Sequence, residues 1–245
     1  MSTAAPDPSR AAQVAGRWLP VRERVASAAR GAGRPVDDVA VLLACKTVPA
    51  DVIRAAVLAG ADLLGHNRVQ ELVATAPDLA DLAPSWHVIG PLQSNKVNAA
   101  LRWAAAVQSV ADPDLAARLS RRCEALGRDL EVWVQVNVSG EPTKSGVPPE
   151  AALDLACAVA GMPHLRLAGL MTVGARSPDA GVVRAGYRLL RELRDAVTGS
   201  GSPGTAGATG LSMGMSGDLE LAVAEGATVV RLGSAVFGPR RAAPV

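Results

Sequence analysis

The hydrophobic pattern of the chain alternates between short apolar runs and segments with helical periodicity. After an expected disordered, proline-containing tail over residues 1–9, apolar side chains recur every third or fourth position and predict an amphipathic helix over 10–30. Runs rich in leucine and β-branched residues then predict eight strands, with helical patterns between them. The predicted strands span residues 39–47, 62–67, 86–90, 106–110, 130–138, 165–174, 210–214 and 228–238.

Strands that alternate with helices along 245 residues predict an α/β fold. We expect one (β/α)8 TIM-barrel domain over residues 10–240, although a doubly wound open sheet predicts the same local pattern. In a barrel, the N-terminal helix would cover the face that stays open because little chain follows the eighth strand. The glycine-rich stretch 199–210 is too short to separate domains and is expected to be a loop.

Composition and charge narrow the class of protein. The net charge is 25 − 23 = +2, and only six aromatic residues accompany arginines scattered over helix faces, which argues against a nucleic-acid surface. The N-terminus lacks a signal-peptide core, and no apolar run reaches membrane-spanning length, so we expect neither export nor membrane insertion. Cys45, Cys123 and Cys157 are far apart without metal-ligand spacing, which indicates reduced thiols in the cytoplasm.

A lysine near the end of the first predicted strand is the first candidate for chemistry. Lys46 follows an apolar run, and burying an ammonium group is costly unless it is paired or deprotonated. It can extend from the barrel rim or pair with a carboxylate, or it can be an amine with a lowered pKa that forms a Schiff base. Neighbouring predicted strand ends carry no Asp or Glu, which weakens the pairing alternative. Strand alternation places Cys45 on the opposite side, beneath the helices.

Two glycine-containing segments late in the chain are candidate phosphate-binding loops. The segments 212–218 (SMGMSGD) and 231–238 (RLGSAVFG) contain the ends of the last two predicted strands. The loops after strands seven and eight are a recurrent phosphate site on this fold, where backbone N–H groups and hydroxyls bind the anion. Ser216 can instead be a plain helix N-cap that needs no ligand. A Schiff-base lysine together with such loops indicates pyridoxal 5′-phosphate (PLP).

Several motifs together resemble one protein family. The chain contains LLACKT, GHNRVQE, WHVIGPLQSNK, VQVNVSGEPTKSGV, LRLAGLMTVG and SMGMSGDLELAVAEGATVVRLGSAVFG within residues 39–238. These segments are similar to those of the PLP homeostasis protein family, and the co-occurrence of WHxIGxLQxNK with SMGMSxD is the specific part. The resemblance implies a single-domain, fold-type III barrel related to the N-terminal domain of alanine racemase and lacking its C-terminal β-domain.

The resemblance also implies a role for each matched residue. Lys46 is expected to hold PLP as a Schiff base, and Arg231 is expected to face the pyridine nitrogen. Ser216, Gly233 and Ser234 are expected to bind the phosphate. An arginine keeps the pyridine nitrogen unprotonated, which makes the cofactor a weaker electron sink than an aspartate partner would.

Further positions near the expected site are less constrained. Asn67 and Met213 are expected to be pocket residues. Lys144 lies in a segment that passes near the rim, where it either accepts departing PLP by transimination or is a solvated loop lysine. Relatives have a glutamate where this chain has His66, which places a titratable ring beside the cofactor loop. His87 is expected to be a buried histidine with satisfied hydrogen bonds.

The resemblance implies a carrier of PLP rather than an enzyme. Alanine racemases take a second base, a tyrosine, from the C-terminal β-domain, and the only tyrosine here, Tyr187, lies on the apolar stripe of a predicted outer helix. We expect a monomer that serves vitamin B6 homeostasis by carrying PLP reversibly and delivering it to apo-enzymes, its transient partners. The alternatives are an amino-acid racemase or decarboxylase with Lys46 as single base, and a Schiff-base aldolase that acts on a phosphorylated sugar without PLP.

Overall fold

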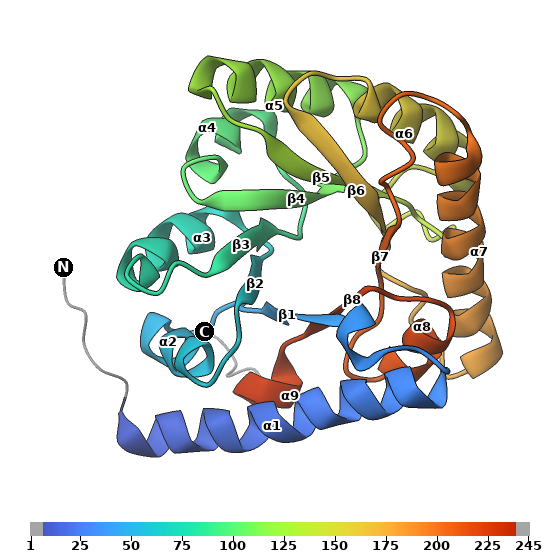
Figure 1. Cartoon of the computed structure of the whole chain (residues 1–245). Helices are drawn as coiled ribbons and strands as arrows, with labels where there is room; N and C mark the ends of the chain where they lie inside the picture. Colours follow the sequence, from blue (N-terminus) through green and yellow to red (C-terminus); the bar gives the residue numbers. More distant parts are fainter. Residues whose placement is uncertain (1–6, 239–245) are drawn as a thin grey trace.

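The eight strands pair in chain order and close into one parallel barrel, as the hydrophobic pattern predicts (Figure 1). The computed structural model describes residues 7–238. Pairing of the first strand with the last, from Ala40↔Val229 to Leu43↔Leu232, completes the ring and excludes the open sheet. The strands are β1 (Ala40–Ala44), β2 (Leu63–His66), β3 (Ser85–Val88), β4 (Ala104–Val110), β5 (Leu130–Gln135), β6 (Leu165–Met171), β7 (Gly210–Ser212) and β8 (Val229–Leu232).

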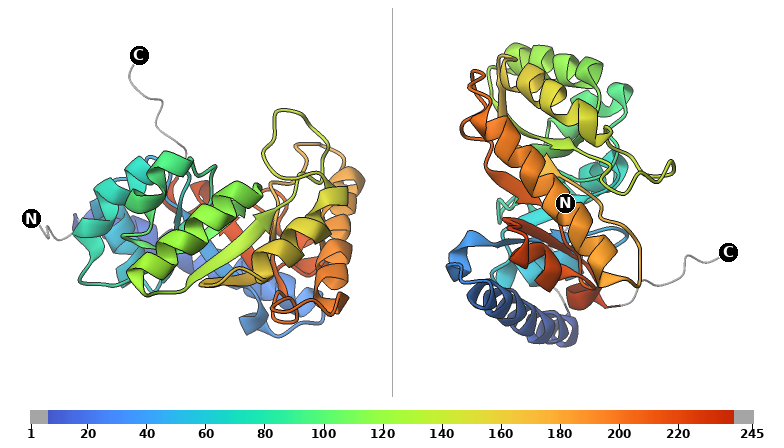
Figure 2. Two further views of the ribbon diagram at one scale, coloured as in Figure 1. Left: turned by 90° about the horizontal axis from the view of Figure 1, so that it is seen from above. Right: turned by 90° about the vertical axis from the view of Figure 1, so that its right-hand side faces the viewer.

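Helices surround the barrel, and the segment after β5 projects from one end of it (Figure 2). In the described range, no helix is both long enough and apolar enough to cross a bilayer. The α-helices are α1 (Pro8–Gly31), α2 (Ala50–Leu58), α3 (Val69–Thr75), α4 (Val97–Ala100), α5 (Pro113–Leu126), α6 (Ala152–Ala160), α7 (Ala180–Gly199), α8 (Leu219–Ala224) and α9 (Ser234–Phe237). Short 3₁₀ turns are η1 (Val36–Asp38), η2 (Ala76–Leu79), η3 (Ser94–Lys96) and η4 (Pro149–Ala151).

Most observed strands differ by a few residues from the predicted ranges, and two boundaries have a clear local cause. α1 begins at Pro8 because the Asp7 carboxylate accepts the backbone N–H of Ser9 at 2.9 Å and proline is favourable in a first helical turn. The predicted strand over 228–238 ends at Leu232, since the carbonyl of Gly233 starts the α9 turn instead. Residues 1–6 of the predicted tail and 239–240 of the predicted domain lie outside the described residues.

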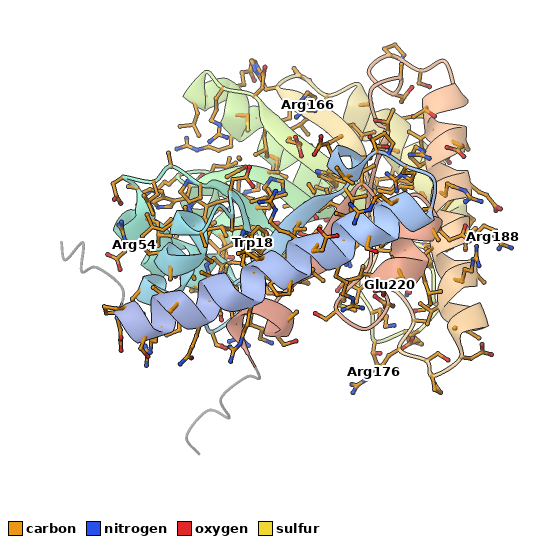
Figure 3. The ribbon with its side chains drawn as sticks, turned by 60° about the horizontal axis from the view of Figure 1, so that its bottom comes forward. Trp18, Arg54, Arg166, Arg176, Arg188 and Glu220 are labelled. Carbon is orange, nitrogen blue, oxygen red and sulfur yellow. The ribbon has the colours of Figure 1, made fainter. Side chains whose placement is uncertain are left out.

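α1 takes the place that a helix after β8 would occupy. It lies against α2, α8 and α9 (Figures 1 and 3). The side chains that it buries recur at spacings of three and four, which is the pattern that predicts the helix from the sequence. They are Val14, Trp18, Val21, Val25 and Ala29.

Strand side chains alternate between the barrel interior and the layer beneath the helices. The interior apolar cluster is small and consists of Leu42, Ile89, Trp133, Ala168, Met171 and Val229. The larger apolar cluster packs the outer side of the strands against the helices and includes Cys45, as predicted. Every cysteine is a free thiol.

One ionic cluster joins α7 to the end of α8. Glu225 is only 2% exposed, and its carboxylate accepts hydrogen bonds from Arg184 Nε at 2.6 Å and Arg191 Nη1 at 2.8 Å. Arg188, labelled in Figure 3, lies 3.6 Å from the same carboxylate. Burial alone would raise the pKa of Glu225, but the three guanidinium groups hold it below its ordinary value.

Candidate functional site

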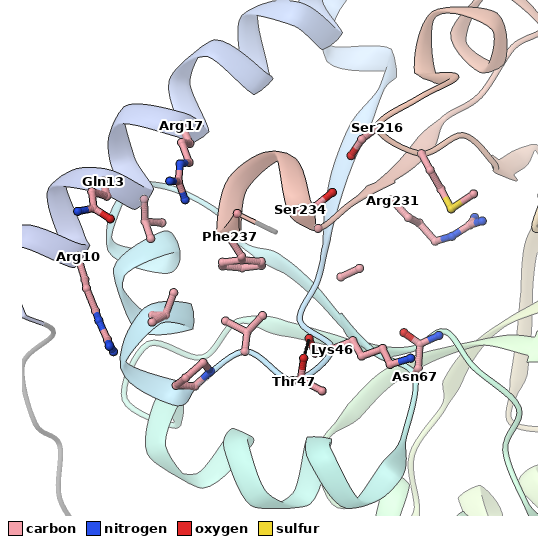
Figure 4. Close-up of a pocket in the computed structure, with 18 of the residues that line it drawn as sticks. Arg10, Gln13, Arg17, Lys46, Thr47, Asn67, Ser216, Arg231, Ser234 and Phe237 are labelled. Atoms are coloured by element: carbon pink, nitrogen blue, oxygen red, sulfur yellow. Dashed lines mark hydrogen bonds between the residues drawn. The ribbon is translucent and has the colours of Figure 1, made fainter. Parts of the chain in front are cut away.

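A cavity of about 640 Å³ opens at the carboxyl ends of the strands, the end of the barrel where ligands bind on this fold (Figure 4). It brings together six of the seven residues that the sequence places at the cofactor site: Lys46, Asn67, Ser216, Arg231, Gly233 and Ser234. The volume lies within the range of about 300–1,000 Å³ typical of small-molecule sites.

Lys46 enters the cavity from a tight turn after β1. The N–H of Val48 donates to the carbonyl of Cys45 at 3.1 Å, and Thr47 between them has φ 58°. A β-branched residue in this left-handed region is strained, at a cost on the order of 1–3 kcal/mol. The Lys46 side chain extends toward Asn67 (Figure 4). Among residues 7–238, no carboxylate forms an ion pair with the Lys46 amine. Within this range, the structure therefore excludes the alternative that Lys46 is paired with an acidic side chain.

Two serine hydroxyls face the cavity from the loops after β7 and β8 (Figure 4). Within the described chain, neither Ser216 Oγ nor Ser234 Oγ has a hydrogen-bond partner. Ser216 is not a plain N-cap, because α8 begins at Leu219 with Asp218 in the capping position. Both hydroxyls are therefore available to an anion in the cavity, beside the backbone at Gly233.

Arg231 forms part of the cavity wall and is itself 6% exposed. Its Nη1 donates to the carbonyl and the hydroxyl of Ser212 at 2.7 and 2.8 Å, and its Nη2 donates to the carbonyl of Thr172 at 2.6 Å. Burial lowers the pKa of Arg231 to about 10, and the guanidinium stays charged at neutral pH. Since a guanidinium has five N–H donors, two remain without a protein acceptor in the described part of the chain.

Tyr187 lies closer to this site than its place on an outer helix suggests. Its ring is fully buried beneath α7, and its hydroxyl lies near the carboxylate of Asp218 without a hydrogen bond of ordinary geometry. Burial, with the nearby Asp218 carboxylate, raises the pKa of Tyr187 above its ordinary value. The phenol is not a residue of the cavity wall, and it stays protonated at any physiological pH.

In the segment 212–218, the methionine that lines the cavity is not the one that the sequence predicts. Met213 is fully buried in the outer apolar cluster, whereas Met215 lines the cavity. The reason is strand alternation: Ser212 faces the barrel interior, so its neighbour Met213 points outward.

Two of the histidines lie outside the cavity wall. His66 points away from Asn67 and stacks on Trp86, with ring centroids 5.4 Å apart. Its Nδ1 lies 3.5 Å from Glu71, so the ring does not lie beside the cofactor loop as expected. His87 is buried in the barrel interior, as expected, and its Nδ1 lies 2.8 Å from Gln108 Nε2.

Lys144 is not brought to the cavity. Its amine donates to Glu141 Oε1 at 2.7 Å and to the carbonyl of Gly174 at 2.8 Å, and its side chain is only 17% exposed. It therefore fastens the projecting segment after β5 to the segment after β6, and it is not a solvated loop lysine.

Residues of α1 complete the cavity, and sequence reasoning missed them. Arg10, Gln13 and Arg17 line it together with Phe237 of α9 (Figure 4). Spacings of three and four place these α1 side chains on one helix face. That stripe was visible in the sequence, but only the packing of α1 across the end of the barrel reveals what it faces.

Comparison with known proteins identifies the family. A family model described as the N-terminal domain of alanine racemase matches residues 24–241. The pyridoxal phosphate homeostasis protein of Pseudomonas aeruginosa is 43% identical over 220 residues, which cover 90% of this chain and 93% of that protein. The PLP-bound structure of PipY from Synechococcus elongatus is 33% identical, with a TM-score of 0.78 over 92% of this chain and 100% of that one.

A more distant structure shares the fold alone. Alanine racemase from Corynebacterium glutamicum is 17% identical, with a TM-score of 0.68, and the match covers 94% of this chain and 62% of the racemase. The barrel thus corresponds to part of the racemase. The chain belongs to the pyridoxal phosphate homeostasis protein family, whose barrel is that of the N-terminal domain of alanine racemase.

Proposed function

We propose that this chain binds PLP covalently through Lys46 and takes part in PLP homeostasis. The observation that carries the proposal is the convergence in one cavity of an amine and two serine hydroxyls, none with a side-chain partner among residues 7–238, and a buried guanidinium. The names of the homologues and the PLP bound to PipY support the same function.

The residues present fit PLP. When bound, the cofactor supplies an aldehyde that condenses with a primary amine. Lys46 would hold the aldehyde carbon, Arg231 would face the pyridine nitrogen, and Ser216 and Ser234 would hold the phosphate. Gly233 keeps this end of the cavity open, because a Cβ there would lie 3.0 Å from the carbonyl oxygen of Ala44. No side chain therefore fills the space between β8 and β1.

The site supports carriage of PLP rather than racemisation. Two-base racemisation requires a second proton acceptor on the opposite face of the substrate. Tyr187 cannot serve, because it lies outside the cavity wall and burial keeps its phenol protonated. We further propose that a monomer binds the cofactor and delivers it to apo-enzymes.

The binding test uses the small number of lysines. The sequence contains three, Lys46, Lys96 and Lys144, so borohydride reduction of the PLP-loaded protein followed by peptide mapping identifies the attachment site directly. We expect the label on Lys46, and loss of both label and visible absorbance in Lys46→Ala but not in the control Lys96→Ala. A reducible adduct at normal occupancy in Lys46→Ala would refute the assignment.

The carrier function needs a separate test. Mixed with a PLP-requiring apo-enzyme, the loaded protein should restore that enzyme's activity while losing its own absorbance at the same rate. Incubation with amino acids should give no more than stoichiometric conversion. Racemisation or decarboxylation over many turnovers would favour the single-base enzyme instead, and absence of a chromophore would favour the aldolase.

A further inference from the structure

A chain of four polar side chains crosses the barrel interior beneath the cavity. Arg231 of β8 donates to Ser212 Oγ of β7 at 2.8 Å. The Ser212 hydroxyl lies 2.7 Å from Gln108 Oε1 of β4, and Gln108 Nε2 lies 2.8 Å from His87 Nδ1 of β3. All four side chains are buried. Such a chain is costly unless each group has a partner, and here each link is made.

Each hydrogen bond that links these four side chains has a fixed direction. Arg231 can only donate, so the Ser212 oxygen accepts from it, and the Ser212 O–H donates to Gln108 Oε1. The amide nitrogen of Gln108 then donates to His87 Nδ1, which must be unprotonated. The reverse orientation of the amide would leave the buried Ser212 O–H without an acceptor, at about 1–3 kcal/mol.

We infer that His87, acting through Gln108 and Ser212, is a positioning residue that holds Arg231 with its two remaining N–H groups toward the pyridine nitrogen of PLP. The inference rests on the proposed function. The acceptor at His87 Nδ1 fixes the Gln108 amide, the amide fixes the Ser212 hydroxyl, and the hydroxyl fixes one guanidinium nitrogen. Without that acceptor the amide is free to reverse, and the Ser212 O–H then loses its acceptor and must turn toward another one, which disturbs the hydrogen bond that Ser212 accepts from Arg231.

The surroundings of His87 keep it in the required state. Burial lowers its pKa to about 4, although Glu131 of β5 opposes this shift. Glu131 is itself bound by Arg166 of β6 and by the indole N–H of Trp133. The neutral ring with its proton on Nε2 is therefore the form that faces Gln108 at neutral pH.

The first measurement is the tautomer of His87 in the PLP-free protein. The sequence has only three histidines, so ¹⁵N-labelled histidine gives three assignable rings. We expect His87 to be neutral with its proton on Nε2 from pH 6 to 8. A proton on Nδ1 in this range would overturn the inference, whatever the protein does with PLP.

The second measurement compares His87→Asn with His87→Phe. The amide oxygen of asparagine can replace Nδ1 as an acceptor, whereas phenylalanine keeps a ring of similar size without one. By spectral titration, we expect His87→Phe to bind PLP about tenfold more weakly, which corresponds to ~1.4 kcal/mol, and with a shifted absorbance maximum. His87→Asn should stay within about threefold of wild type.

A control separates this effect from a loss of packing. Gln108→Met retains length but breaks the chain, and it should reproduce the spectral shift of His87→Phe. If His87→Phe does not fold, Gln108→Met provides the same comparison. Two results would overturn this inference and leave the proposed function intact. One is a wild-type PLP affinity and absorbance spectrum in a folded His87→Phe or Gln108→Met variant. The other is an equal loss of PLP affinity in His87→Asn and His87→Phe. Wild-type protein that takes up no PLP would overturn the proposed function as well.

Discussion

Gly90→Ala tests how closely the barrel packs against the cofactor pocket. Gly90 follows β3 and is buried, and a Cβ at this position would lie 2.5 Å from the carbonyl oxygen of Asn67 and 2.9 Å from its Cα. The obstacle is backbone, so no side-chain rotation relieves it, and the loop that carries Asn67 must shift by about half an ångström or more. Overpacking of this kind costs about 2–3 kcal/mol. For a protein of this size, that cost lowers Tm by about 4–12 °C.

The assay measures stability and PLP affinity on the same preparations. The control is Gly16→Ala, which makes the same chemical change at an exposed position of α1 with nothing within 4 Å of the new Cβ. It should raise stability by about 0.5–1 kcal/mol, because alanine is the better helix former. We expect Gly90→Ala also to weaken PLP binding, since Asn67 lines the pocket. A Tm unchanged in Gly90→Ala, or equal shifts in both variants, would refute the reasoning.

Substitutions at three other positions probe the phosphate site, the ionic cluster and the loop after β5. Ser234→Asp should weaken PLP binding by more than about tenfold, because it places a carboxylate beside a phosphate in a poorly screened pocket. Ser234→Ala should have a smaller effect; equal affinities in spectral titration would remove Ser234 from the phosphate site. Glu225→Gln should cost about 1–2 kcal/mol at pH 7, discounted for the exposure of its arginine partners. The folded-state pKa of Glu225 is depressed, so its contribution is present above about pH 4.3 and is lost as pH falls through the folded value. The difference in Tm from wild type should therefore shrink on acidification, and a constant difference would contradict this account. Lys144→Ala should increase protease cleavage after β5 while leaving the rate of PLP transfer unchanged; slower transfer at equal occupancy would instead support transimination by Lys144.

Hydrophobic periodicity predicted most of the fold because burial of alternating strand faces and helix stripes dominates its stability. The number of strands and the covering role of α1 followed from it, whereas closure of the sheet into a barrel did not, because a doubly wound open sheet has the same local pattern. The error at residues 234–237 arose because SAVF fits a strand as well as a helix, and the turn at Gly233 decided between them. The start of α1 depended on a single cap, Asp7, which periodicity does not register.

The sequence predicted those residues of the candidate site whose chemistry depends on a single residue type. Lys46 stands out because an amine beside a buried strand is costly, and the serines stand out beside glycines at strand ends. Met213 was misplaced because the motif was transferred without following strand alternation through it. The link from His87 to Arg231 could not be foreseen, because it joins side chains from four strands through contacts that exist only in the closed barrel.

The pocket joins residues from the two ends of the described chain, which ties cofactor loading to the order of synthesis. Lys46 belongs to the first strand, whereas Gly233 and Ser234 follow the last one, and β1 reaches its partner β8 only when nearly the whole chain is available. At the usual rate of translation, this interval is on the order of ten seconds or more. During that time the nascent chain carries the amine but not the phosphate loops, so an aldehyde that reacts with it has no anchor. If Lys46 and the loop at Gly233 and Ser234 hold PLP as proposed, stable uptake becomes possible only after β8 has closed the barrel, and the colour of the bound cofactor then reports completed folding.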